Sequence, residues 1–312
     1  MTGMAAGPVD FAMCGRQRMN GQYRATMMAA LWPVLLLAGC ATAPVAPSTR
    51  YVALGSSFAA GPGITVSADD PANRCTRSRD NYAHQLARLR HLDLVDVSCG
   101  GATTAHLLGP WNELAPQLDA LTPDTALVTI TIGGNDVGFV GYLFAQSCKT
   151  VQERPDLEQA SAMCRGMAAR QPAGPAPAAP TQAIWAKLDA DLDRVVAQVR
   201  TRAPRARLIF VDYVSLLPTG APCSQVPLSM DALATARATA DRLAGITATV
   251  AQRNGAEVLR ASDLSRGHDA CAAEPWSNGL VARPGVDPFT PYHPNLAGMT
   301  AIATALDDLL RR

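Results

Sequence analysis

The chain has 312 residues, of which 48% are hydrophobic and 5% aromatic, and this size suits one large or two small globular domains. Its formal net charge of +1 argues against a nucleic-acid partner, because a surface that binds phosphates must be basic. The chain as a whole is therefore nearly neutral.

The N-terminal segment has the pattern of an export signal. Arg24 precedes an apolar stretch, residues 25–38, that is too short to span a bilayer comfortably. The sequence then reads Leu37-Ala38-Gly39-Cys40, and small residues just before a cysteine resemble the bacterial lipobox. We expect residues 1–39 to be a lipoprotein signal peptide and Cys40 to carry a lipid that anchors the exported protein to a membrane. An ordinary secretory signal followed by a chance cysteine is the alternative.

Two stretches rich in Ala and Pro are expected to lack regular structure. Residues 40–50 form a short extended tether, which leaves 51–312 as the globular domain. The second stretch, near 170–180, contains four prolines. We interpret it as an excursion on the surface of the domain, because functional motifs flank it on both sides.

The domain begins with an apolar run, residues 51–54, that is long enough for one buried strand. Gly55 breaks the strand, and Ser57 follows two residues later with small residues around it. A small-residue turn that carries a hydroxyl at the end of a buried strand is how an α/β enzyme presents a nucleophile. Taken alone, this stretch is equally compatible with a strand followed by a Ser- and Gly-containing loop.

Strands and helices then alternate along the chain. This order predicts right-handed crossovers and a three-layer α/β/α sandwich with a mainly parallel, five-stranded sheet. In such sheets, sites form where the strands end. Further strands are predicted at 94–97, 126–132, 208–211 and 257–259. Helices are predicted at 81–91, from Ile184 to a stop before Pro204, at 231–254 and at 295–310, the last with Leu296, Met299, Ile302, Leu306 and Leu309 facing inward.

Three later motifs give the serine turn its context. They are Ser98-Cys-Gly-Gly-Ala-Thr103, Ile132-Gly-Gly-Asn-Asp136 and Tyr292-His-Pro-Asn295. Together with Ser57 they place Ser, Gly, Asn and His in an order that resembles the SGNH (GDSL-type) hydrolases, most closely their secreted actinobacterial esterase and lipase branch. The resemblance extends from Tyr51 to the C-terminus and implies hydrolysis of carboxylic esters through an acyl-serine intermediate.

The resemblance also implies a role for each motif residue. Ser57 is the expected nucleophile and His293 the base that removes its proton. The backbone N–H groups of Ser57 and Gly101 and the side chain of Asn135 are the expected oxyanion hole, since fixed donors stabilise the charge that develops on the carbonyl oxygen. Each residue also has a plainer interpretation: Gly101 as a turn glycine, Asn135 as a turn cap, and His293 as a surface histidine.

Two positions depart from the family pattern. Ser56 stands where the family usually has Asp before the nucleophile, and Thr290 stands where the acid three residues before the histidine is expected. Some secreted relatives use a main-chain carbonyl in place of that acid, so a Ser–His dyad is compatible with the family. We expect the Thr290 carbonyl to orient His293, with Asp287 as the alternative third member of a triad.

The domain contains six cysteines, and an even number in an exported chain implies disulfides. Spacing alone allows fifteen pairings. The family resemblance favours the sequential pairs Cys75–Cys99, Cys148–Cys164 and Cys223–Cys271. A metal site is the rival interpretation, but the spacing of zinc ligands is absent from the sequence. Neither a metal nor an organic cofactor is implied.

The sequence therefore predicts an exported, lipid-anchored and monomeric serine esterase. Its substrate would be a small-molecule or lipid ester. A carbohydrate or phospholipid deacylase with the same machinery is the first alternative. A catalytically silent lipoprotein that binds the cell envelope is the second, and the departures at Ser56 and Thr290 are what favour it.

Overall fold

The computed structural model describes residues 48–154, 156–170, 178–285 and 289–312. The chain divides into two units, Met1–Val45 and Ala46–Arg312, and all the described residues belong to the second unit. Several features expected from the sequence lie outside the described residues, namely the signal peptide, Cys40, most of the tether and Asp287.

A five-stranded sheet forms the centre of the second unit, and every neighbouring pair of its strands is parallel. The strand order is β2-β1-β3-β4-β5. The innermost strands β1 and β3 are almost wholly buried, as expected for strands covered on both faces. The strands are β1 (Arg50–Gly55), β2 (Asp93–Asp96), β3 (Leu127–Thr131), β4 (Arg207–Val211) and β5 (Glu257–Leu259).

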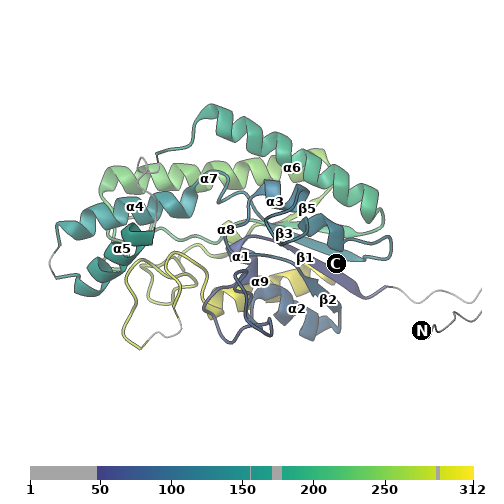
Figure 1. Cartoon of the computed structure of the whole chain (residues 1–312), viewed down its shortest axis with the longest axis horizontal. Coiled ribbons are helices and arrows are strands. Elements are labelled where there is room, and N and C mark those ends of the chain that lie inside the picture. The colour runs from purple at the N-terminus through teal and green to yellow at the C-terminus, as the bar shows by residue number, and fades with distance from the viewer. Residues whose placement is uncertain (1–47, 155, 171–177, 286–288) are drawn as a thin grey trace, which may run out of the picture. The chain divides into compact units, whose positions relative to one another are not determined.

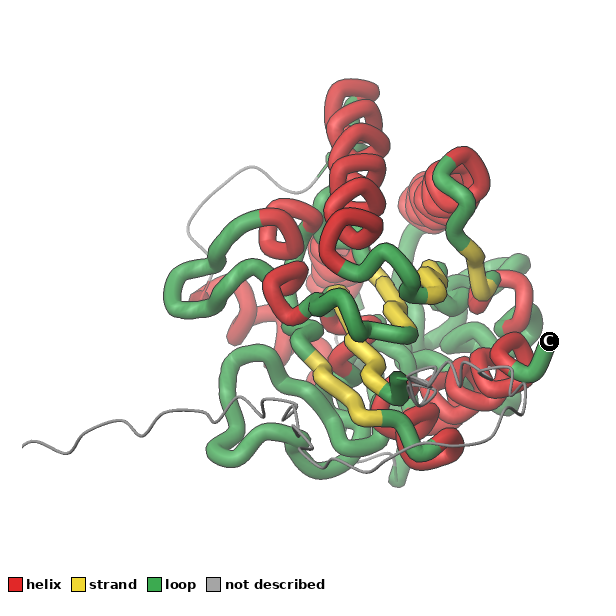
Figure 2. The backbone as a smooth tube through the Cα atoms, turned by 90° about the vertical axis from the view of Figure 1, so that its right-hand side faces the viewer, coloured by secondary structure: helices red, strands yellow, loops and turns green. Residues whose placement is uncertain are grey.

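Helices cover both faces of the sheet, which confirms the three-layer α/β/α fold. In Figure 1, α2 and α9 lie below the sheet and α6 and α7 lie above it, and each pair is in contact. Figure 2 views the same layers from the side, with the strands between the red helices. The bounds are α1 (Ser57–Ala60), α2 (Tyr82–Arg90), α3 (Thr104–Leu108), the 3-10 helix η1 (Gln117–Ala120), α4 (Phe139–Gln152), α5 (Glu158–Arg170), α6 (Gln182–Arg202), α7 (Met230–Arg253), α8 (Ala261–Leu264) and α9 (Leu296–Leu310).

Capping residues explain why the long helices start where the sequence predicts. Asn81, Thr181, Ser229 and Asn295 each accept a hydrogen bond from the backbone N–H three residues further on, at the start of α2, α6, α7 and α9. The side-chain oxygen thereby pairs with one of the first helical N–H groups, which have no partner within the helix.

The structure corrects the expected inner face of α9 at one position. Leu296 is 46% exposed, whereas Met299, Ile302 and Leu306 are buried. Ile184 of α6 is likewise 38% exposed. Both lie in the first turn of their helices. Side chains there lean toward the N-terminus, so they extend over the region before the helix and remain exposed.

Helices α4 and α5 are additional to the elements expected from the sequence. Gly138 starts α4 without a side-chain cap, and Gly141 and Gly166 lie within the two helices, where glycine lowers helix propensity. Contacts between the helices and the disulfide Cys148–Cys164 hold them together. Tertiary packing therefore forms this region where the local sequence signals are weak.

The cysteines in the described ranges form three disulfides, Cys75–Cys99, Cys148–Cys164 and Cys223–Cys271, which are the sequential pairs that the resemblance favours. Over the described ranges, none of the helices combines the length and apolar character needed to cross a bilayer.

Candidate active site

The strand order determines where on the sheet edge a site is expected. The chain runs from β1 to β2 on one side and then returns past β1 to β3, so the order of the sheet reverses between β1 and β3. Ligands bind at such a reversal, outside the carboxyl ends of the strands. Ser57 lies two residues after the end of β1, and Asn135 lies four residues after the end of β3. The fold thus brings two of the motifs to the same point of the sheet edge.

The turn that carries Ser57 requires glycine at its start. Gly55 has a φ of +143°, and a Cβ there would lie 2.4 Å from the carbonyl oxygen of Thr131 on β3. The Ser56 N–H donates to that same oxygen at 2.9 Å. The chain can therefore leave the sheet sharply and present Ser57 as the first residue of α1.

Ser57 and His293 meet in a buried hydrogen bond. The distance between Ser57 Oγ and His293 Nε2 is 2.7 Å, although the residues are 236 positions apart. Each residue is only 8% exposed. A hydroxyl within hydrogen-bond reach of an imidazole is the arrangement that activates a serine nucleophile.

The second ring nitrogen of His293 is held by the main chain. Its Nδ1 lies 2.7 Å from the carbonyl oxygen of Pro291. A carbonyl can only accept, so Nδ1 carries the proton and Nε2 is free to accept the proton of Ser57. The expectation of a main-chain acceptor is thus met, but the residue expected for it, Thr290, is wrong. The Thr290 carbonyl instead accepts from the side chain of Asn278 at 3.1 Å.

Burial sets the charge state of the imidazole. Removal from water disfavours the protonated ring, and this lowers the pKa of His293 from 6.5 to about 4, while the hydrogen bond to the Pro291 carbonyl opposes the shift. At neutral pH the ring is therefore uncharged, as a base must be.

Three N–H groups of the motifs have donor capacity that other described residues do not use. Among the described residues, the backbone N–H groups of Ser57 and Gly101 have no hydrogen-bond acceptor. The side-chain amide of Asn135 donates one hydrogen to the Ala102 carbonyl at 2.9 Å, which leaves its second hydrogen available. This bond also joins the Asn135 turn to the residue that follows Gly101.

Asp136, the next residue, fastens the same two turns together. Its carboxylate accepts from the Thr104 N–H at 3.1 Å and also from the Thr104 hydroxyl. Burial raises the pKa of Asp136, and the bonds from Thr104 oppose the rise. Since Thr104 begins α3, the carboxylate also lies at a helix N-terminus, where negative charge is favoured.

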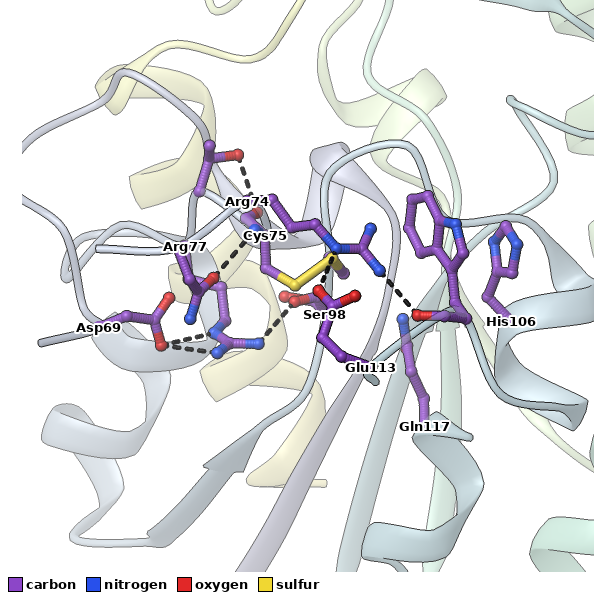
Figure 3. Close-up of a disulfide and its surroundings, with 12 residues drawn as sticks. Asp69, Arg74, Cys75, Arg77, Ser98, His106, Glu113 and Gln117 are labelled. Carbon is purple, nitrogen blue, oxygen red and sulfur yellow. Dashed lines mark hydrogen bonds and ion pairs between the residues drawn. A yellow bond between two sulfur atoms is a disulfide. The ribbon is translucent and has the colours of Figure 1, made fainter. Parts of the chain in front are cut away.

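The disulfide Cys75–Cys99, drawn in Figure 3, ends at the residue before the Gly100–Gly101 turn and supports it. The Gly100 N–H donates to the Cys75 carbonyl at 3.0 Å. Arg77 binds the Ser98 carbonyl at 3.0 Å and the Asp69 carboxylate at 2.6 Å, as Figure 3 also shows. The turn is therefore fixed both covalently and by hydrogen bonds.

An aromatic side chain borders Gly101. A Cβ at this glycine would lie 3.3 Å from the ring of Trp111. The Trp111 ring is stacked on His106 at a centroid distance of 4.0 Å, and the guanidinium of Arg74 lies 4.0 Å over it. Gly101 combines a φ of +86° with this close neighbour, so a larger residue would be strained there.

The structure also brings to the site a residue that the sequence motifs do not include. Tyr213 follows β4, and its hydroxyl accepts from the Gly134 N–H at 2.8 Å. Its ring contacts Phe58 at a centroid distance of 4.5 Å, and Phe58 in turn lies 5.2 Å from the His293 ring. In the part of the chain that is described, no three His, Cys, Asp or Glu side chains are grouped as metal ligands would be.

A serine hydrogen-bonded to a buried, neutral histidine at the carboxyl edge of a parallel sheet is the arrangement expected of a serine hydrolase, because the histidine can activate the hydroxyl for attack on an acyl group. The sequence pattern of the GDSL-like lipase/acylhydrolase family matches residues 53–301. The chain therefore belongs to this family, and it is an ester hydrolase.

Three relatives illustrate the similarity. Over 283 residues, Lipase 2 of Streptomyces coelicolor is 33% identical, which covers 88% of this chain and 90% of that protein. The crystal structure of an extracellular lipase from Streptomyces rimosus matches with a TM-score of 0.62 and 28% identity, over 84% of this chain and 99% of the other. The crystal structure of phospholipase A1 from Streptomyces albidoflavus NA297 matches with a TM-score of 0.63 and 25% identity, over 83% of this chain and 98% of the other.

Proposed function

We propose that the protein is an exported serine esterase or lipase that cleaves carboxylic esters with a Ser57–His293 dyad. The observation that carries this proposal is the 2.7 Å hydrogen bond between Ser57 Oγ and a histidine that is buried and neutral. The carbonyl of Pro291, at 2.7 Å from Nδ1, takes the orienting role that an acid has in a triad.

In the first half of the reaction, Ser57 Oγ attacks the ester carbonyl carbon and its proton passes to His293 Nε2. The oxygen of the tetrahedral intermediate accepts hydrogen bonds from the Ser57 and Gly101 N–H groups and from the Asn135 amide. The bond to the alcohol then breaks, and the alcohol leaves with the proton from His293. The product is an acyl-serine.

In the second half, a water molecule takes the place of the alcohol. His293 removes a proton from the water as it attacks the acyl carbon, and the same three donors bind the oxyanion again. Collapse returns the proton to Ser57 Oγ and releases the carboxylic acid. The cycle requires no group beyond the side chains and backbone already named.

A phospholipid deacylase is the second candidate, and the observation that favours it is the structural likeness to phospholipase A1 from Streptomyces albidoflavus. Both candidates use the same chemistry and differ in the alcohol that leaves. Initial rates on a diacyl phosphatidylcholine and on p-nitrophenyl esters of rising chain length separate them.

Export and anchoring belong to the same proposal. The three disulfides favour an oxidising compartment, and the chain resembles an extracellular lipase. The N-terminal pattern that ends at Cys40 favours a lipid anchor, with residues 51–312 as the catalytic domain of a monomer.

Labelling with a fluorophosphonate tests the nucleophile directly, because the reagent forms a covalent bond with an activated serine. We expect one label per chain, on the peptide that contains Ser57, and none after Ser57→Ala. A folded wild-type protein that takes up no label and cleaves no ester would overturn the proposal and leave a binding lipoprotein as the alternative.

A further inference from the structure

Tyr213 connects the two turns that carry the proposed nucleophile and the proposed oxyanion donor. Its hydroxyl accepts a 2.8 Å hydrogen bond from the N–H of Gly134, the residue before Asn135. The same hydroxyl lies 3.3 Å from Oγ of Ser56, the residue before Ser57. The first contact is short for an N–H donor and the second is long for a pair of hydroxyls, so the bond to Gly134 dominates.

The ring of Tyr213 fixes where this hydroxyl lies. The side chain is only 8% exposed and packs against Phe58 at a centroid distance of 4.5 Å. Gly134 lies directly on the ring, since a Cβ at that position would come within 2.7 Å of the Tyr213 hydroxyl oxygen. Only a glycine allows the peptide before Asn135 to approach the phenol so closely.

We propose that Tyr213 is a positioning residue for catalysis, which holds the Asn135 amide in place through the N–H of Gly134. The inference rests on the proposed function, because it concerns the oxyanion donor of that reaction. Asn135 is already tied to the Ala102 carbonyl through its side chain. The bond from the Gly134 N–H to Tyr213 fixes the backbone of the preceding residue, so Asn135 is held through its own side chain and through its neighbour in the chain.

A donor of this kind acts only where it is aimed at the developing charge, and a displacement of about 1 Å can cost roughly a hundredfold in rate. Without the phenol oxygen, the buried Gly134 N–H loses its acceptor and the peptide is free to rotate toward another. The phenol oxygen can accept this bond at neutral pH, where Tyr213 is protonated, and burial raises its pKa further above the ordinary value.

Tyr213→Phe tests the inference, because it removes the hydroxyl and keeps the ring that packs on Phe58. We expect kcat to fall roughly ten- to a hundredfold on a p-nitrophenyl ester with little change in KM, as for a donor aimed at the transition state. Tyr51→Phe is the matched control. That residue is also buried, and its hydroxyl bonds the Thr129 side chain of β3 at 2.7 Å rather than a residue of the Ser57 or Asn135 turn.

A double-mutant cycle with Asn135→Ala distinguishes positioning from a general structural role. If Tyr213 acts through Asn135, then Tyr213→Phe lowers kcat by less than about threefold when Asn135 is already alanine. An equal loss in both backgrounds, a rise in KM, or a loss no larger than that of Tyr51→Phe overturns the inference. So does an Asn135→Ala variant with wild-type kcat.

The proposed function is tested separately by Ser57→Ala. If that variant keeps its activity, the dyad itself is wrong. If Ser57→Ala is inactive but Tyr213→Phe lowers kcat equally in both Asn135 backgrounds, the dyad stands and only the role of Tyr213 is lost. Circular dichroism melting of each variant establishes that the folded protein is being compared.

Discussion

The carbonyl oxygen of Pro291 lies 2.7 Å from Nδ1 of His293, only two residues further along the chain. Tyr292, between them, has a φ of +56°, an uncommon conformation for a residue with a side chain. The turn that this conformation makes allows the histidine to be oriented by its own loop. Within the described residues, the proposed base is therefore oriented by a main-chain carbonyl and not by a carboxylate.

Asp287→Asn is consequently expected to lower kcat less than about tenfold, since the carbonyl acceptor survives the change. In serine proteases with an Asp–His–Ser triad, replacing the aspartate by asparagine lowers kcat by about 10⁴, because the histidine then adopts the wrong tautomer. Steady-state kinetics on a p-nitrophenyl ester measure the difference. A folded variant that loses a thousandfold or more would make Asp287 the third member of a triad.

Ser57→Ala and Ser56→Ala form a matched pair, because each removes one buried hydroxyl from the same turn. We expect Ser57→Ala to have negligible esterase activity and an unchanged fold, since no nucleophile remains. Ser56→Ala should keep substantial activity, because its Oγ makes only the 3.3 Å contact with Tyr213. The reverse result would move the nucleophile to Ser56.

The sequence was sufficient to predict the parallel sheet, because apolar strands that alternate with helical segments are visible along the chain and favour parallel pairing. The resemblance of the motifs to those of the SGNH hydrolases also paired Ser57 with His293, and Oγ of the serine lies 2.7 Å from Nε2 of the histidine. The sequence could not identify which carbonyl faces His293, since this depends on the backbone angles of Tyr292.

Tyr213 was missed for a different reason. It belongs to none of the motifs, and its place at the site follows from the pairing of β3 with β4, which brings the ends of these strands together. Which strand pairs with β3 is decided by the topology of the whole sheet. A phenol two residues after β4 has no local pattern that distinguishes it from a core tyrosine.

Asn135→Ala is expected to lower kcat by a factor on the order of 10²–10³, the usual cost of one oxyanion donor. KM should change little, because the amide is proposed to bind the developing charge more strongly than the bound ester. The two constants are measured together on one ester. A change confined to KM would assign Asn135 to substrate binding.

Cys40→Ser is expected to abolish metabolic labelling with a fatty acid and partitioning into detergent, because the thiol is the proposed site of lipid attachment. Cys14→Ser is the matched control, since Cys14 also lies in the N-terminal segment but has no small residues in the lipobox pattern before it. Partitioning that persists in Cys40→Ser would contradict the anchor and leave a secreted protein.

The last prediction concerns the pH at which the base becomes active. An unperturbed histidine would make activity rise through about pH 6.5. Burial lowers the pKa of His293 to about 4, so the ring is neutral above about pH 4 and protonated below it. We therefore expect kcat/KM to be nearly constant from about pH 5 to 8 and to fall as the pH drops through about 4.

The same shift has a consequence for stability. Between about pH 6.5 and about 4 the unfolded chain binds a proton at this histidine and the folded chain does not. The free energy of unfolding should therefore decrease as the pH falls through this window, and His293→Gln should reduce that dependence. Urea denaturation at several pH values measures it. An acid limb of kcat/KM centred near 6.5 would mean that His293 is solvated in the working enzyme, contrary to the buried geometry described above.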